Sequence, residues 1–181
     1  MSSVPPPPAA PSADRLAEIG LFGGLDRETL GLLAEELPVL RVPAGEDVVR
    51  EGEPATDMFV VLAGELEVFK RAPSGAEARV AVLGPSDWFG EMAILDVQPR
   101  SATVRAVAPT VLLRMTAEHV ERLLYRRDPK AYAMLLMNVA RELSRRLRVA
   151  DNLVAQLVAT VSETYVRRSQ APSDASGPSG R

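Results

Sequence analysis

The sequence predicts an α+β protein: an antiparallel β jelly roll (double-stranded β-helix), flanked by N-terminal helices and followed by a long C-terminal dimerisation helix. Two observations predict this fold. Between residues 39 and 115, short β-branched runs alternate with Gly, Pro and Asp at spacings of about ten residues, which is typical of an antiparallel roll or barrel. From residue 129 to about residue 166, no helix breaker interrupts a heptad pattern of apolar residues.

The composition is that of a soluble globular protein with an aliphatic core, because 46% of the 181 residues are hydrophobic and only 4% are aromatic. The chain has no cysteine and one histidine, His119, which excludes disulfides and thiolate metal sites and leaves no histidine cluster for zinc. Its net charge of −3 argues against a surface that grips nucleic acid throughout. We expect a cytoplasmic protein without membrane spans, because the sequence has neither a signal peptide nor a long apolar run.

Four segments follow from the distribution of apolar residues and prolines. Five of the 15 prolines fall within the first eleven residues. Such a stretch has too little apolar surface to offset the entropy of ordering, and the same is true of the Ser- and Gly-rich end of the chain. We therefore expect a disordered N-terminus over 1–13, a roll with flanking helices over 14–128, a long helix over 129–166 and a disordered tail over 167–181.

The helices around the roll are predicted from apolar spacing and from capping residues. Apolar residues recur at helical spacing over 14–37, with a break at Gly23 and Gly24, and Asp26 is a good N-cap for the second part. Thr116 is placed to cap a short helix that includes His119. The strands expected between these helices are Val39–Val42, Val48–Arg50, Met58–Leu62, Leu66–Lys70, Ala78–Leu83, Ala102–Val107 and Val111–Met115.

The long helix begins with Pro129 and carries an apolar heptad stripe, which predicts self-dimerisation through residues 133–161. The alternative is that the stripe packs on the roll, which we expect only for the first turns, where Leu135, Met137 and Val139 widen it. The members of the stripe are Ala133, Leu136, Ala140, Leu143, Leu147, Ala150, Val154, Leu157 and Val161.

Arginines cluster on the same helix. Arg141, Arg145, Arg146 and Arg148 form either a solvated face with charge pairs or a DNA-contacting region. The sequence favours the solvated face, because no aromatic residues or recognition-helix pattern accompany the charge.

The segment 88–104 carries the most specific chemistry. Gly90 allows close approach of the backbone, and Met92–Leu95 can form one helical turn whose first N–H groups favour an anion. Arg100 and Ser101 add donors suited to phosphate. A carboxylate repels phosphate but accepts hydrogen bonds from sugar hydroxyls, so Glu91 together with Arg100 suggests a sugar-phosphate ligand. The alternative is a structural salt bridge between Glu91 and Arg100.

These residues resemble a known family. The runs Gly90–Ala93 and Pro99–Val104 look like the phosphate-binding cassette of the cyclic nucleotide-binding domain, which is found in bacterial catabolite activators, kinase regulatory subunits and gated channels. The resemblance extends over residues 21–151. Supporting runs are Pro43–Glu46, Glu51–Pro54, Met58–Leu62 with Gly64, and Gly84–Glu91.

The resemblance implies a role for each cassette residue. Glu91 would accept a hydrogen bond from the ribose 2′-hydroxyl, Arg100 would neutralise the cyclic phosphate and Ser101 would donate to it. The amides of Gly90 and Ala102 would line the pocket together with Met92 and Ala93. Val68 and Val80, in the roll, match positions that pack on the base or the sugar.

Two departures from the family's pattern limit these expectations. The bacterial activators contact adenine through hydroxyl residues on the long helix, whereas the two possible alignments here give Arg146 and Leu147, or Ala150 and Asp151. Arg146 suits the N7 or O6 edge of a purine or stacking on its ring, so the ligand is cAMP or cGMP. The family's activators also continue into a helix-turn-helix domain after the long helix. Here only about fifteen residues follow Val166, which is too few for such a domain, so direct DNA binding is not expected.

We therefore expect a stand-alone cyclic nucleotide sensor that transmits binding through its dimerising helix to an unknown downstream protein. It needs no cofactor and is not an enzyme, since no nucleophile–base pair is visible. One alternative is a dimerisation or scaffold module with a vestigial pocket. Another is a transcription regulator that acts through a separate DNA-binding partner.

Overall fold

The computed structural model describes residues 10–96 and 98–169. Contacts within the chain divide it into two compact units, one up to Val139 and one from Ala140 onward. The expected disordered segments fall largely outside the described residues. The helical elements are α1 (Ala13–Ala17), η1 (Gly20–Phe22), α2 (Arg27–Glu36), α3 (Met92–Leu95), α4 (Ala117–His119), η2 (Val120–Tyr125) and α5 (Pro129–Ser169).

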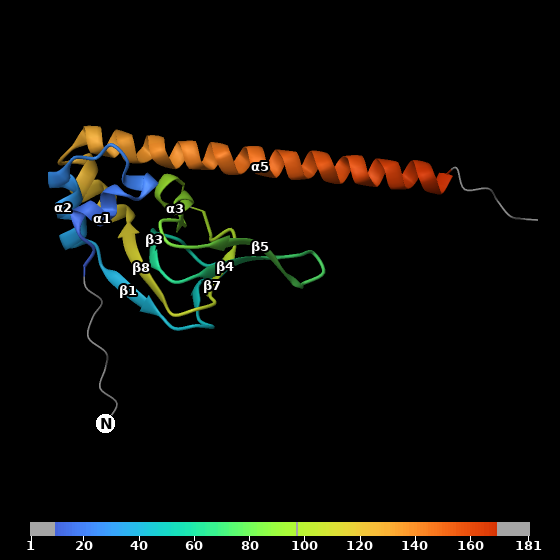
Figure 1. Cartoon of the computed structure of the whole chain (residues 1–181), viewed down its shortest axis with the longest axis horizontal. Helices are drawn as coiled ribbons and strands as arrows, with labels where there is room; N and C mark the ends of the chain where they lie inside the picture. The colour runs from blue at the N-terminus through green and yellow to red at the C-terminus, as the bar shows by residue number, and fades with distance from the viewer. Residues whose placement is uncertain (1–9, 97, 170–181) are drawn as a thin grey trace, which may run out of the picture. The chain divides into compact units, whose positions relative to one another are not determined.

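Two four-stranded antiparallel sheets form the roll and confirm the predicted fold (Figure 1). One sheet has the order β1-β8-β3-β6 and the other the order β2-β7-β4-β5. The strands are β1 (Val39–Val42), β2 (Asp47–Val49), β3 (Asp57–Ala63), β4 (Leu66–Arg71), β5 (Glu77–Leu83), β6 (Trp88–Phe89), β7 (Thr103–Ala106) and β8 (Thr110–Thr116).

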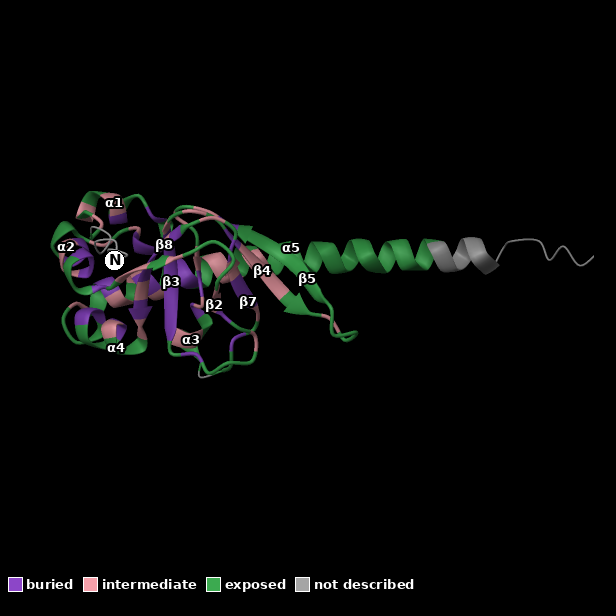
Figure 2. Ribbon diagram, turned by 90° about the horizontal axis from the view of Figure 1, so that it is seen from below, coloured by how far each residue is buried: buried purple, intermediate pink, exposed green. Residues whose placement is uncertain are grey.

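The core of the roll lies between the two sheets and is aliphatic, as the composition predicts. β3 is buried over most of its length (Figure 2). The two phenylalanines of the core, Phe59 and Phe89, stack with ring centroids 5.2 Å apart. The other buried members of this core are Val49, Val61, Leu66, Leu83, Val104, Ala106 and Leu112.

The predicted caps form as expected, but two helical segments differ from a regular α-helix. Asp26 accepts a hydrogen bond from the Thr29 N–H at 2.8 Å and begins α2. The region before Gly23 is a short α-helix followed by the 3-10 turn η1, and the segment after α4 is the π-helical η2. β6 is a two-residue strand that the sequence pattern did not predict.

The first turns of α5 pack on the N-terminal helical region. Leu135 and Val139 are buried, as the widened apolar stripe predicts, whereas Met137 is 49% exposed. The Asn138 amide donates to the carbonyl oxygens of Leu21 at 3.0 Å and Gly23 at 2.8 Å. This amide therefore fixes the start of α5 against η1 and the loop that follows it.

Between Ala140 and Glu163, α5 is largely exposed, and three of its arginines contact side chains within one turn of the helix. Glu142 accepts hydrogen bonds from Arg145 at 2.6 Å and Arg146 at 2.8 Å, and Arg148 donates to the Ser144 hydroxyl at 2.8 Å. The bond from Arg145, followed by that from Arg146, lowers the pKa of Glu142. Local pairing of this kind agrees with the solvated face that the sequence favours.

Candidate functional site

The segment 88–104 folds into a strand, a tight turn, one helical turn and a second strand. Gly90 follows β6 with φ +80°. A Cβ at this glycine would lie 2.7 Å from Nη1 of Arg100 and 3.1 Å from the carbonyl oxygen of Asp57. Both the backbone conformation and the lack of space therefore require glycine, which explains the close approach that the sequence predicts here.

The predicted single helical turn is present as α3. Ala93 donates its N–H to the Gly90 carbonyl oxygen at 3.0 Å, and Ile94 donates to Glu91 at 3.1 Å. Glu91 precedes this turn and is only 3% exposed. The buried carboxylate of Glu91 therefore follows directly on Gly90, the glycine against which Arg100 packs.

Arg100 is turned inward. Its residue is 9% exposed, and its Nη1 donates to the carbonyl oxygen of Asp57 at 2.7 Å. Its Nη2 forms an ion pair with Oδ1 of the same aspartate. The guanidinium carbon lies 5.7 Å from the centroid of the Phe59 ring. Arg100 is therefore held by a carboxylate, as one alternative reading of the sequence supposed, but that carboxylate is Asp57 rather than Glu91.

Asp57 is a buried carboxylate shared by two arginines, and sequence reasoning missed it. Its residue is 7% exposed, and its Oδ2 lies 2.5 Å from Nε of Arg114 on β8. The available signal was an acidic residue directly before the apolar run of β3, because a carboxylate at such a position needs a cationic partner.

The main chain of Arg100 is fixed by the loop between β2 and β3. Gly52 donates its N–H to the Arg100 carbonyl oxygen at 2.9 Å, and Arg100 donates its N–H to the Glu53 carbonyl oxygen at 2.8 Å. Glu51 donates its N–H to the Thr103 hydroxyl at 3.0 Å. The run Glu51–Pro54, which the resemblance includes, therefore positions the backbone of the cassette arginine.

The remaining predicted site residues are not gathered as tightly. Val68 on β4 is half-buried against the core and lies opposite Val104. Val80 lies at an irregularity of the β4–β5 pairing and is 55% exposed. Met92 and Ser101 are exposed, and Ala93 and Ala102 are half-buried. Arg146 belongs to the other compact unit, so its contact with a base stays a prediction.

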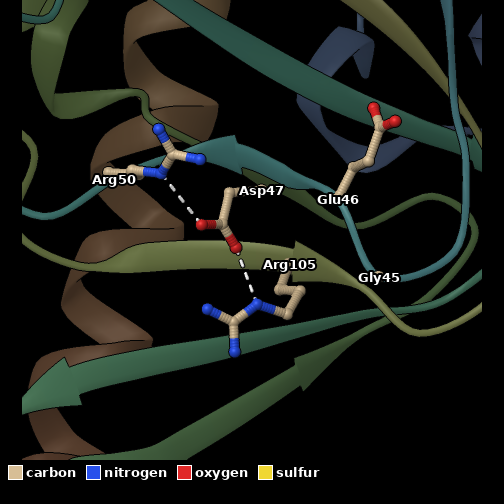
Figure 3. A pocket seen from close by; sticks show the side chains of 5 residues that line it. All are labelled: Gly45, Glu46, Asp47, Arg50 and Arg105. Carbon is tan, nitrogen blue, oxygen red and sulfur yellow. Dashed lines mark hydrogen bonds and ion pairs between the residues drawn. The ribbon is translucent and has the colours of Figure 1, made fainter.

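A separate hollow lies over β2 and β7 and contains no cassette residue (Figure 3). Asp47 lies between Arg105, whose Nε is 2.7 Å from Oδ1, and Arg50, whose Nε is 3.0 Å from Oδ2. The hydrogen bond from Arg105, supported by that from Arg50, lowers the pKa of Asp47. The hollow is lined by Gly45, Glu46, Asp47, Arg50 and Arg105, and its aspartate is already compensated by the two arginines.

The described residues contain neither a metal site nor a membrane-spanning helix. No group of three or more His, Asp or Glu side chains in this part of the chain is arranged to hold a metal ion. No helix within 10–96 and 98–169 combines the length and apolarity needed to cross a membrane.

Residues 39–127 match the family model described as the cyclic nucleotide-binding domain, and the chain belongs to this family. The resemblance found in the sequence is therefore confirmed.

The relatives are regulators. The chain is 32% identical over 145 residues, 80% of its length, to a CRP-like cAMP-activated global transcriptional regulator of Mycobacterium tuberculosis, of which it spans 62%. It is 32% identical to the catabolite activator protein of Thermus thermophilus, with TM-score 0.68 over 77% of this chain and 63% of that one. The N-terminal domain of a transcriptional regulator from Streptomyces coelicolor is 31% identical, with TM-score 0.66 over 75% of this chain and 94% of that one.

Proposed function

We propose that this chain is a cyclic nucleotide sensor, which binds the sugar-phosphate of cAMP or cGMP in the cassette formed by Gly90–Ala93 and Arg100–Ala102. One observation carries the proposal: a buried arginine and a buried carboxylate flank a glycine that has no room for a side chain. Arginine suits the phosphate, and a carboxylate suits the hydroxyl of the attached sugar.

The division of roles follows the chemistry of each group. Glu91 accepts from the ribose 2′-hydroxyl, Arg100 neutralises the phosphate and Ser101 donates to it. The exposure of Ser101 and Val80 leaves both accessible to a ligand. cAMP is the first ligand to test, since it appears in the name of the M. tuberculosis relative. Arg146 would favour the N7 and O6 acceptors of guanine, so cGMP is the second.

The protein transmits ligand binding through a dimer, which is formed by residues 133–161 of α5. Support comes from the heptad stripe, whose members are exposed apart from the half-buried Leu136 and Leu143. The buried face of its first turns is formed by Ala131, Leu135 and Val139, none of which belongs to the stripe. Four stripe members are at least 61% exposed: Leu147, Val154, Leu157 and Val161. Ligand binding would favour one arrangement of this helix over another, and a downstream protein would bind that arrangement.

We further infer a non-enzymatic, cytoplasmic role, with the signal passed to a partner protein rather than directly to DNA. The local pairing of Arg145 and Arg146 with Glu142 supports this reading of the arginine cluster.

Thermal unfolding with and without ligand tests the cassette assignment. A ligand that binds only the folded state raises the midpoint as its concentration exceeds Kd. We expect cAMP or cGMP to raise the midpoint of the wild type, and 5′-AMP to do so less. Arg100→Ala should abolish the ligand-induced rise. If Arg100 were only a structural partner of Asp57, the variant would lose stability but keep the rise, and this result would contradict the assignment.

A further inference from the structure

The distal part of α5 is apolar beyond its heptad stripe. Val149, Leu153 and Val158 lie outside the stripe, and each is at least 51% exposed. Leu153 directly precedes the stripe member Val154, and Val158 directly follows Leu157, so the two flank the stripe on opposite sides. Such flanking positions carry charged residues in a two-stranded coiled coil, whereas a wider apolar face is typical of a helix with more than one neighbour. The seam of the proposed dimer therefore does not account for these three side chains.

A parallel, in-register dimer would bring the flanking residues of two copies together. In such a pair, a residue just before the stripe in one copy adjoins the residue five positions later in the other copy. Leu153 and Val158 have this separation. Arg146 and Asp151 have it as well, and their opposite charges favour the parallel arrangement. Because Val149 lies one turn before Leu153, each side of the dimer would carry an apolar patch made of Val149 and Leu153 from one copy and Val158 from the other.

The helix is positively charged at one end of each patch. Between Ala140 and Asp151 there are four arginines but only two acidic residues, Glu142 and Asp151. The next charged residue after Asp151 is Glu163. A further copy of α5 laid parallel on the patch would set its own arginines against these, and like charges repel. A helix that has an apolar face and acidic residues near one end matches both features of the patch.

We propose that the dimer binds an acidic amphipathic helix of the downstream protein on each of these composite patches. The apolar face of that helix would cover Val149 and Leu153 of one copy and Val158 of the other, and its acidic residues would lie opposite the arginines. The inference rests on the proposed function, because neither copy forms the patch alone. A ligand that favours one arrangement of the two helices would thereby create or remove the site that the downstream protein binds.

A synthetic fluorescent helix is the probe for the patch. It has leucines at positions i, i+3, i+4 and i+7 and glutamates at one end, and its control has lysines in place of the glutamates. Fluorescence anisotropy measures the binding of both peptides to the full chain, with and without saturating nucleotide. We expect the glutamate peptide to bind on the order of tenfold more tightly than the lysine peptide. Equal affinities, or no saturable binding in either condition, would overturn the proposal.

Substitutions at the flanking positions test where the peptide binds. Leu153→Gln and Val158→Gln should each weaken its binding on the order of tenfold and leave the dimer intact, because polar residues are common at such positions. Ala159→Gln is the matched control, since Ala159 is exposed on the side of the helix opposite the stripe. A loss of affinity in this control equal to that in Leu153→Gln would overturn the proposed location.

A mixture of the two weakened variants tests whether the patch is composite. A heterodimer of a Leu153→Gln chain and a Val158→Gln chain contains one intact patch, because each chain supplies the residue that the other lacks. We expect the mixture to recover tight peptide binding in part, after the copies have exchanged. No recovery would overturn the composite patch.

Sedimentation velocity and nucleotide titration separate this inference from the proposed function. A dimer that binds cyclic nucleotide but not the glutamate peptide would overturn the inference alone, and a dimer that binds the peptide but no nucleotide would contradict only the proposed nucleotide binding. A monomeric wild type would contradict both. Association of the wild type into tetramers, or its binding to phosphatidylglycerol vesicles, would overturn the proposed partner if Leu153→Gln abolished it, because further copies or a lipid surface would then cover the patch.

Discussion

At the scale of single residues, the site depends on one glycine that brings the backbone against a guanidinium. Gly90 has φ +80°, and a side chain there would collide with Arg100. Gly75, in the turn between β4 and β5, has a similar φ of +86°, but nothing lies within 4 Å of its Cβ position. Alanine substitutions at these two positions can therefore be compared. Gly75→Ala measures the free-energy cost of the backbone conformation alone, and Gly90→Ala adds the cost of the close approach.

We expect Gly75→Ala to lower the free energy of unfolding by about 1–2 kcal/mol, the cost of a left-handed conformation. Gly90→Ala should cost about 1–3 kcal/mol more, because Arg100 and the Asp57 backbone must move. It should also weaken nucleotide binding, which Gly75→Ala should not. Urea unfolding and ligand titration measure both effects, and equal behaviour of the two variants would contradict the close approach.

The single histidine makes the stability of the α4 cap depend on pH. The Thr116 hydroxyl accepts from the His119 N–H at 3.1 Å, and His119 Nδ1 accepts from the Thr116 N–H at 3.2 Å. Burial, with a contribution from the positive charge of Arg122, lowers the pKa of His119. Below about pH 6.5, the ordinary histidine value, the unfolded chain binds more protons than the folded chain, so stability falls as the pH falls.

We expect the free energy of unfolding to decrease between pH 7.5 and pH 5.5, and His119→Gln to reduce this decrease. Glutamine at this position preserves the reciprocal cap without titrating in that range. Urea unfolding of both proteins at the two pH values is the measurement. An equal decrease in wild type and variant would show that His119 is not responsible.

The sequence alone predicted the residues of the cassette, but it did not predict Asp57, the carboxylate that pairs with Arg100. Glu91, Arg100 and Gly90 stand in one short segment, so their types and spacing were visible together. Asp57 is 43 residues from Arg100 and 57 from Arg114. The pairing of β3 with β8 brings Arg114 to Asp57, and the loop between β2 and β3 holds Arg100 beside it. The local pattern indicates that Asp57 needs a cationic partner, but it does not identify the two arginines that lie far away in the sequence.

At the scale of elements, apolar periodicity predicted the strands and helices where burial on one face decides the structure. β1 has the predicted bounds, and most other strands differ by a residue or two. β6 was missed because Trp88 and Phe89 form only two pairs with β3, within a turn-rich segment that has no alternation of its own. The π-helical η2 was missed because it has the same apolar spacing as an ordinary short helix.

The heptad stripe of α5 leads to a prediction about association. Leu157 is 69% exposed and lies in the second half of the stripe. Leu157→Asp would place a charge in the proposed seam and should convert a dimer to a monomer, because coiled-coil core positions exclude unpaired charge. Sedimentation velocity measures the mass of both proteins.

Asn152→Asp is the control for this variant, since Asn152 is an exposed position off the heptad stripe. It should leave the dimer intact. A wild-type protein that is monomeric at high concentration would contradict the proposed seam, as would a Leu157→Asp variant that remains dimeric.

At the scale of the whole molecule, the roll brings residues from distant parts of the chain together around the cassette arginine. The loop after β2 holds the Arg100 backbone, the start of β3 holds its side chain, and the turn after β6 supplies Gly90 and Glu91. The chain spans 62% and 58% of two curated cAMP-related regulators that it matches. What they share with this chain is the binding fold, so binding is the property to measure first.

The most direct test of the account is isothermal titration of the wild-type protein with cAMP, followed by cGMP. We predict saturable heat with a stoichiometry of one nucleotide per chain for at least one of the two, and its loss in Arg100→Ala. The absence of heat at millimolar concentrations of both nucleotides would contradict the central claim that the cassette binds a cyclic nucleotide.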